Sequence, residues 1–248
     1  MTAARAFRHR ILVVVGQSQF VSGVREGQRT EGTVLTRHTG ETNTWQARIA
    51  VQRMDLPAIL RIHDKFTAFW HKDPNAGEGV GLEALVIQQH RQNFALWHEE
   101  DRARDPNASA DQIAQTKRAI DALNQVRNDL IEAVDRELLQ QLEIAGVRTG
   151  GELHSETPGM IIDRLSILSL KIFHTQEQIE RDDVESVHIE RNRQRLEVLL
   201  RQRQDLSGCL DALWRDIQAG KRHFKLYRQL KMYNDPELNP AIYGARNR

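Results

Sequence analysis

The central element of the sequence is Ser155-Glu-Thr-Pro-Gly-Met-Ile-Ile-Asp-Arg-Leu-Ser-Ile-Leu-Ser-Leu-Lys-Ile-Phe-His174. Thr157 followed by Pro158 is typical of a helix N-cap with proline at the first helical position, where the missing N–H of proline costs no hydrogen bond. From Met160 to Phe173 apolar residues occur almost all round the predicted helix. Such a helix should be buried on most sides, as the central helix of a bundle is.

Charged residues interrupt this apolar helix at Asp163, Arg164, Lys171 and His174. Because a buried charge is costly unless it is paired, we expect Asp163 and Arg164 to be at least partly buried and to find partners on neighbouring helices. The expected network consists of His90, Asn93, Asp101, Asn124, Arg127, Asn128, Asp163 and Arg164. The polar residues of the third helix are also compatible with a solvated face, so this part of the network stays open.

The composition favours helices with solvated outer faces: 40% of the 248 residues are hydrophobic, 28% are charged and only 6% are aromatic. A formal net charge of +1 gives no reason to expect nucleic acid or a membrane surface as a partner. No apolar run approaches the roughly 20 residues that cross a bilayer. The single cysteine, Cys209, excludes an intramolecular disulfide and is expected in the core. A reducing cytoplasm is the simplest location.

Helical spacing recurs in every long segment, and no segment shows convincing alternation of the kind that strands have. We therefore predict an all-α fold: a single bundle of five or six helices with a long antiparallel pair. Besides the central helix, one predicted helix begins after Asp55. The others run from about Leu82 to Arg104, from Ser109 to about Ala145, from about Val184 to Ala219, and from Lys221 to Lys231. The helix from Val184 is the fourth in this order. The fourth of these carries a heptad-like seam with Arg203 at one core position.

The chain divides at residue 53. Residues 1–53 carry eight arginines, no lysine and five of the fifteen glycines, and the stretch from Gly27 to Thr44 has no sustained period. We expect an N-terminal extension that is disordered or loosely structured: a mobile tail or an upstream extension ahead of Met54, or else a basic arm for an anionic partner. Residues 54–248 should form the bundle, with an extended tail from Met232 because Asp235-Pro236 and Asn239-Pro240 cannot continue a helix.

The motifs of catalysis and metal binding are missing from the sequence. Neither the Glu-x-x-His pairs of di-iron bundles nor a His-Glu-x-x-His motif occurs, and His90 and Asp101 lie roughly 16 Å apart on one helix. There is also no Gly-x-Ser-x-Gly elbow, and Gly77-Glu-Gly-Val-Gly81 follows no strand. We therefore expect no metal site and no cofactor, and the sequence leaves any catalytic residue unknown.

The best candidate for an anion site is the start of the central helix. Its free N–H groups and the hydroxyls of its first residues favour a phosphate or carboxylate, and the Tyr227 to Asn234 segment adds cationic side chains. The expected site consists of Ser155, Thr157, Gly159, Tyr227, Arg228, Lys231 and Asn234. An ordinary capped helix without a ligand is the alternative, since Glu156 can satisfy the helix dipole itself.

Four segments resemble a family of bacterial all-helical proteins of unknown function, whose members are often encoded beside glycosyltransferases of lipopolysaccharide or other surface-glycan pathways. The segments are Asn93-Phe-Ala-Leu-Trp-His-Glu-Glu-Asp-Arg-Ala-Arg104, Ala119-Ile-Asp-Ala-Leu-Asn-Gln-Val-Arg-Asn-Asp129, the central Ser155 to Lys171, and Phe224-Lys-Leu-Tyr-Arg-Gln-Leu-Lys-Met-Tyr-Asn-Asp-Pro236. The resemblance extends from Met54 to about Tyr243. It implies a role near cell-envelope glycan assembly and supplies no catalytic residue.

Two classes of function follow. The first is a helical accessory or scaffold factor that acts with a glycosyltransferase; the second is an enzyme or binding protein for a small anionic metabolite such as a sugar phosphate. A cavity with unpaired Arg and Lys side chains would favour the ligand, whereas paired charges and an apolar outer patch would favour the scaffold. The sequence does not decide between a monomer and a homodimer.

Overall fold

The computed structural model describes residues 55–74, 77, 79–148, 150–228, 237–240 and 244. Its elements are α2 (Leu56–Trp70), α3 (Gly81–Arg102), α4 (Ala110–Ile144), β1 (Glu152–Leu153), α5 (Pro158–Ile179), α6 (Ser186–Gln218) and β2 (Arg222–His223). Five helices and two very short strands in these ranges confirm the predicted all-α fold. The predicted N-terminal extension and most of the predicted C-terminal tail lie outside the described residues.

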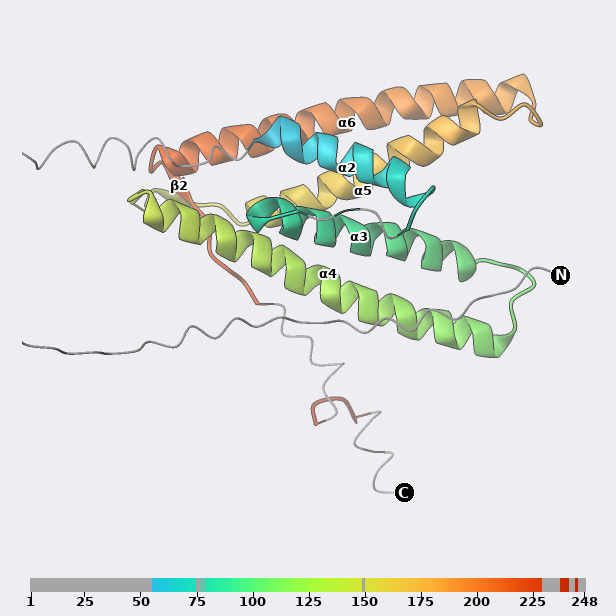
Figure 1. Cartoon of the computed structure of the whole chain (residues 1–248), viewed down its shortest axis with the longest axis horizontal. Helices are drawn as coiled ribbons and strands as arrows, with labels where there is room; N and C mark the ends of the chain where they lie inside the picture. Colours follow the sequence, from blue (N-terminus) through green and yellow to red (C-terminus); the bar gives the residue numbers. More distant parts are fainter. Residues whose placement is uncertain are drawn as a thin grey trace, which may run out of the picture. The chain divides into compact units, whose positions relative to one another are not determined.

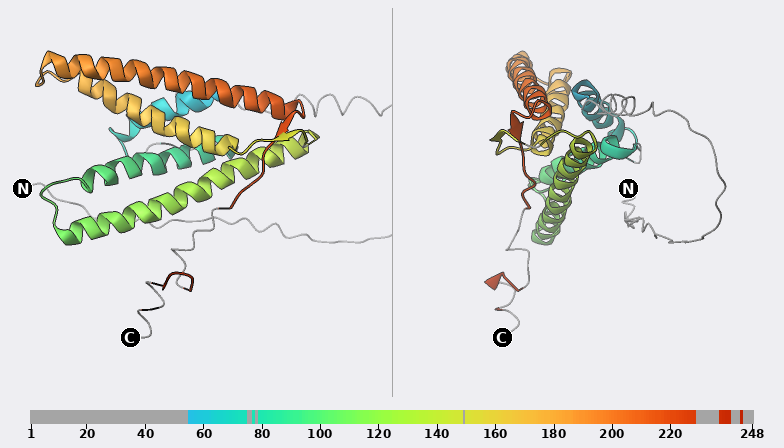
Figure 2. Two further views of the ribbon diagram at one scale, coloured as in Figure 1. Left: turned by 180° about the vertical axis from the view of Figure 1, so that it is seen from behind. Right: turned by 90° about the vertical axis from the view of Figure 1, so that its left-hand side faces the viewer.

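The helices form two antiparallel pairs, α3 with α4 and α5 with α6, with α2 packed between them (Figure 1). Helix α5 packs against α2, α3, α4 and α6, as expected for the central helix of a bundle. Figure 2 shows from the opposite side that α5 runs between α6 and the α3–α4 pair. Polar side chains on the face of α5 that packs against α2, α3 and α4 are therefore enclosed by these three helices.

Three of the described helices, α2, α4 and α5, begin at caps that the sequence predicts. The Asp55 carboxylate accepts a hydrogen bond from the Ala58 N–H at 3.0 Å, and the Thr157 hydroxyl accepts one from the Met160 N–H at 3.2 Å. Ser109 and Gln112 form a reciprocal capping box at the start of α4. Each cap satisfies N–H groups that lack a partner within the first helical turn.

The core forms where α5 meets the other helices. Its fully buried members on α5 are Ile161, Ile162 and Leu165, packed with Val134, Leu138 and Leu142 of α4, Leu210, Leu213 and Ile217 of α6, Val86 of α3, and Leu56 and Ile59 of α2. The seam of α6 is thus buried in its second half. Arg203, at its predicted core position, extends to Asp64 of α2, with 2.7 Å between Nη2 and Oδ2.

Two predictions about the C-terminal part of the chain are wrong. Residues 221–228 are not helical: Arg222–His223 form β2, which pairs in parallel with β1, and the His154 N–H donates to the His223 carbonyl at 2.8 Å. Pairing with β1 and burial of Phe224 outweigh the local helical preference of this basic run. Cys209 is exposed, because the neighbouring Leu210 and Leu213 face the core instead.

Among the described residues, no helix has the length and the apolar character that crossing a membrane requires.

Candidate functional site

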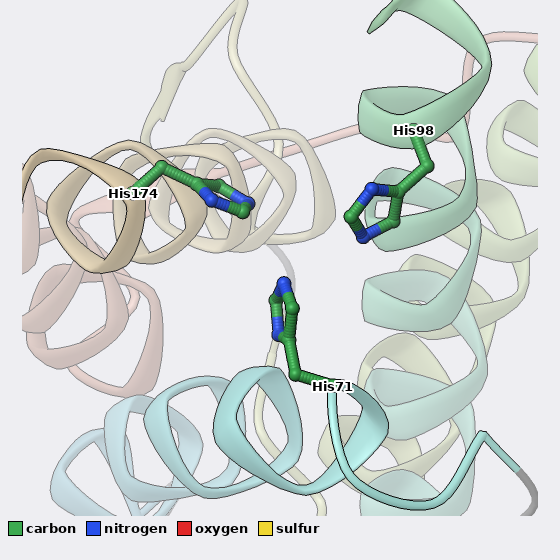
Figure 3. Close-up of side chains that lie close together, drawn as sticks. All are labelled: His71, His98 and His174. Atoms are coloured by element: carbon green, nitrogen blue, oxygen red, sulfur yellow. The ribbon is translucent and has the colours of Figure 1, made fainter. Parts of the chain in front are cut away.

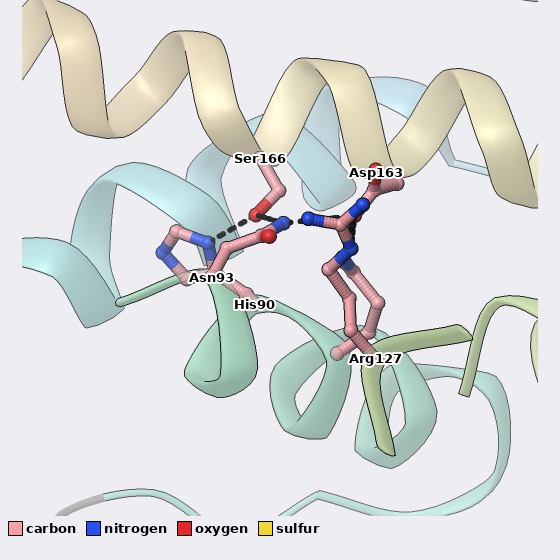
Figure 4. A network of polar contacts seen from close by, with 6 residues as sticks. His90, Asn93, Arg127, Asp163 and Ser166 are labelled. Carbon is pink, nitrogen blue, oxygen red and sulfur yellow. Dashed lines mark hydrogen bonds and ion pairs between the residues drawn. The ribbon is translucent and has the colours of Figure 1, made fainter. Parts of the chain in front are cut away.

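A buried polar network surrounds Asp163 of α5 (Figure 4). Its carboxylate accepts hydrogen bonds from the side-chain amides of Gln89 and Asn93 on α3, the latter at 2.9 Å. The Arg127 Nε of α4 lies 3.5 Å from the same carboxylate oxygen. Burial raises the pKa of Asp163, while Arg127 and the two amide donors act against that rise. One carboxylate therefore joins three helices, and Asn93 and Arg127 are two of the residues expected around it.

The network continues from Asn93 to His90 through Ser166. The Asn93 amide donates to Ser166 Oγ at 2.9 Å, and His90 shares hydrogen bonds with Ser166 Oγ at 2.7 Å and with Thr67 Oγ1 at 2.9 Å. Burial lowers the pKa of His90 to about 3, against a hydrogen bond with the His63 backbone. The imidazole is therefore neutral. Apart from the half-buried Arg127 its members are buried, so this network is positioned to stabilise the bundle and not to bind a substrate.

The other four residues predicted for this network have different environments. Arg164 is exposed, and its guanidinium pairs with Glu156 at 2.7 Å, so the prediction that it is buried is wrong. The residue directly after Asp163 points away from the helix face that α3 and α4 cover. Asp101 is also exposed. Asn124 is half-buried and Asn128 is buried, but among the described residues neither hydrogen-bonds to Asp163.

The start of α5 already holds a carboxylate. Asp135 of α4 accepts hydrogen bonds from the Thr157 hydroxyl and, at 2.7 Å, from the Gly159 N–H. The sequence predicted that these two groups bind an external anion. In the structure they donate to the carboxylate of Asp135 instead. The premise that they are free is therefore wrong, and binding of an external anion at Ser155 stays a prediction.

Asp135 gives the protein a defined pH dependence. Burial raises its pKa to about 6, against the hydrogen bonds from Thr157 and Gly159. A folded-state pKa above the unfolded value means that the folded state binds the proton more tightly, so the stabilisation is present at low pH and is lost as pH rises through about 6. From about pH 5 to about pH 7 this group should lower the free energy of unfolding by roughly 1 kcal/mol.

Urea titrations at these two pH values measure this change. The Asp135→Asn variant is the control, because an amide keeps one acceptor oxygen for Gly159 but does not titrate. It should show a smaller loss over the same pH interval. An unchanged loss in the variant would assign the pH dependence to other groups.

Among the described residues, no hydrogen bond or ion pair joins Tyr227 or Arg228 to the start of α5. Tyr227 is half-exposed and Arg228 is exposed in the segment that follows β2. Lys231 and Asn234 lie outside the described residues.

A cavity lies between α3, α5 and α6, about 590 Å³ in volume. It is lined by Trp97, Asp101, Lys171, His174, Thr175, Gln178, Asn192, Arg195 and Leu199. Among the described residues, neither Lys171 nor Arg195 forms an ion pair. The Arg195 guanidinium donates instead to the Asn192 side-chain oxygen at 3.2 Å, and Asn192 is itself anchored by a hydrogen bond to the His188 carbonyl at 2.9 Å. The cavity therefore presents two cationic side chains.

Three histidines converge beside this cavity: His71 at the end of α2, His98 of α3 and His174 of α5 (Figure 3). One nitrogen from each ring lies within 4.8 Å of the other two. His174 belongs to both groups, since it lines the cavity and stacks on Trp97 with 4.6 Å between ring centroids.

Comparison with known families shows the family of this chain. A family model described as "Protein of unknown function (DUF4254)" matches residues 83–226, more than half of the 248 residues. The chain belongs to the DUF4254 family. The match includes every residue that lines the cavity, as well as His98 and His174, whereas His71 precedes it. No curated protein and no solved structure matched the chain.

Sequence reasoning did not find this site in the DUF4254 protein. It gave Trp97 and Arg195 no role, and it noted Lys171 and His174 only as charged residues that interrupt the central helix. His71 and His98 lie on different helices, so no local spacing links them. The sequence does show that the three histidines lie near the ends of three predicted helices. Only the packing of the bundle brings these helix ends together.

Proposed function

We propose that the protein binds a small anionic metabolite, of the sugar-phosphate class, in the cavity between α3, α5 and α6. The observation that carries the proposal is the pair Lys171 and Arg195, two cations without an ion-pair partner among the described residues, on the wall of one cavity. A volume of about 590 Å³ lies within the range of small-molecule sites, roughly 300–1,000 Å³. Guanidinium and ammonium groups select anions through charge-assisted hydrogen bonds.

The remaining lining residues suit a polyhydroxylated ligand. Asp101 and Gln178 offer oxygens that accept hydrogen bonds from sugar hydroxyls, and the amide of Gln178 also donates. The Asp101 carboxylate would repel a phosphate, so the anionic end of the ligand should lie nearer Lys171 and Arg195. We therefore expect a phosphorylated sugar to bind more tightly than a simple phosphate ion.

Family resemblance supports the class of metabolite. The four segments quoted above resemble a bacterial family whose members are often encoded beside glycosyltransferases of surface-glycan pathways. Sugar phosphates and nucleotide sugars are the anionic substrates of such pathways. This context supports a ligand from cell-envelope glycan synthesis.

Calorimetric titration with sugar phosphates and nucleotide sugars tests the proposal. Replacing Lys171 by Met or Arg195 by Gln should each weaken binding by about tenfold or more, since a hydrogen bond to a charged group contributes about 1.5–3 kcal/mol. The matched control is Arg201→Gln, which removes an exposed charge from the same helix outside the cavity. Equal affinities in all four proteins would exclude this cavity as the site.

The second candidate is an accessory role with a glycosyltransferase. It is favoured by Val187 and Val198, exposed apolar residues that lie three turns apart on one outer face of α6. Copurification from a native host tests it: Val187→Asp with Val198→Asp should abolish capture of a glycosyltransferase, and capture that survives both substitutions would exclude this face.

A further inference from the structure

The histidine cluster brings together side chains that are far apart in the sequence. His71 belongs to the end of α2, His98 to the last two turns of α3 and His174 to the second half of α5. Figure 3 shows the three imidazoles pointing toward a common centre. A neutral imidazole nitrogen is the commonest protein ligand for transition metals.

Hydrogen bonds fix which nitrogens face this centre. His71 Nδ1 lies 2.7 Å from the Thr67 carbonyl oxygen, and His174 Nδ1 lies 2.7 Å from the Glu177 carboxylate. Since both oxygens can only accept, each Nδ1 carries the proton. The lone pair of the neutral ring is then on Nε2, and the buried Nε2 of His174 has no hydrogen-bond partner. Metal-binding histidines are oriented in the same way, by a carboxylate or carbonyl on the far nitrogen.

Aromatic neighbours hold the three rings in place. Phe173 stacks on His71, Phe94 contacts His98 edge-on and Trp97 stacks on His174, each with 4.6 Å between ring centroids.

We propose that His71, His98 and His174 bind one divalent transition-metal ion, with zinc the best match. Three imidazoles and an open fourth position are a recurrent zinc arrangement. At zinc–nitrogen distances of about 2.0–2.1 Å, tetrahedral geometry separates the nitrogens by about 3.3 Å. The separations between the three nitrogens, which lie within 4.8 Å of one another, must therefore shorten by up to about 1.5 Å. His71 is exposed and lies at the end of its helix, so we expect its side chain to make most of this movement.

The open position gives the ion a role beside the cavity. His174 lines that cavity, so an ion bound to it would lie close to any ligand in the cavity. The sequence patterns led us to expect no metal site, because none of the familiar spacings occurs. The proposed metal site therefore departs from the expectation of no metal. It does not depend on the proposed sugar phosphate.

Metal titration of the full chain, purified without a histidine tag and stripped with a chelator, tests the inference. Zn²⁺ should bind with a stoichiometry of one ion at this site and raise the melting temperature, and Co²⁺ should give the visible absorption of a tetrahedral complex. His98→Ala and His71→Gln should each weaken Zn²⁺ binding by about 100-fold or more. Glu177→Gln, which alters only the orienting hydrogen bond, should weaken it by about tenfold.

The matched control is His154→Ala, which removes a half-buried histidine ahead of α5 and should leave binding unchanged. Far-UV circular dichroism without metal verifies that each variant is folded, and the Gln variant preserves most of the side-chain volume. Absence of stoichiometric Zn²⁺ binding by the wild type would overturn the proposal. So would binding that persists at full affinity in folded His98→Ala and His71→Gln.

Discussion

Replacing Asp163 by Ala should lower the free energy of unfolding by about 3 kcal/mol, the low end of the cost of breaking a buried ion pair, because its partner Arg127 is half-buried. The loss would leave the Gln89 and Asn93 amides without their acceptor and the Arg127 guanidinium without its partner carboxylate. Because the network joins α3, α4 and α5, the whole bundle should be affected. Urea unfolding followed by circular dichroism measures the effect.

Asp163→Asn is the control that separates charge from hydrogen bonding. It keeps one acceptor oxygen for the two amide donors but removes the negative charge that faces Arg127. Because burial raises the pKa of Asp163 and so opposes its charge, the Asn variant should lose less stability than the Ala variant. If Asp163→Ala changed stability by less than about 0.5 kcal/mol, the network would not hold the helices together.

Gly159→Ala should destabilise the protein by about 3 kcal/mol, although alanine normally stabilises a helix. A Cβ at this position would lie 2.8 Å from the Ile131 carbonyl oxygen and 2.8 Å from Asp135 Oδ1. To relieve that overlap, α5 must move away from α4. Overpacking costs roughly 1–3 kcal/mol, and weakening the hydrogen bond from the Gly159 N–H to a carboxylate adds about 1.5–3 kcal/mol.

The same substitution at Gly208 should have the opposite sign. Gly208 lies in the middle of α6, and a Cβ there would meet nothing within 4 Å. Alanine should then stabilise the helix by about 0.5–1 kcal/mol, the difference in backbone entropy. Thermal melts of the two variants beside the wild type give the comparison. Equal effects of the two substitutions would contradict the close contact between α4 and α5.

The sequence predicted the helices because local signals determine them. The Asp55, Ser109 and Thr157 caps and the apolar surroundings of Met160 to Phe173 are properties of short segments, and the structure confirms them. The partners of Asp163 were also predictable in part, since the cost of a buried charge requires some polar group on a neighbouring helix. Gln89 was missed because its position on α3 does not by itself distinguish it from a solvated residue.

The functional features depended on contacts between distant segments. Thr157 and Gly159 were expected to offer free donors, but Asp135 lies 24 residues before Gly159 and only packing of α4 on α5 brings it there. Strand β2 forms because β1 lies beside it, and the basic composition of this segment gave no hint of that pairing. Lys171 and Arg195 likewise line one cavity only because of the angle at which α5 packs against α6.

The most direct test of the proposed function is a thermal-shift screen of sugar phosphates and nucleotide sugars on the wild type and on the Lys171→Met, Arg195→Gln double variant. We predict that at least one phosphorylated sugar raises the melting temperature of the wild type, and that the double variant, folded to the same extent without ligand, shows no rise. An equal rise in both proteins, or no rise in the wild type with any of these compounds, would contradict an anion site in the cavity between α3, α5 and α6.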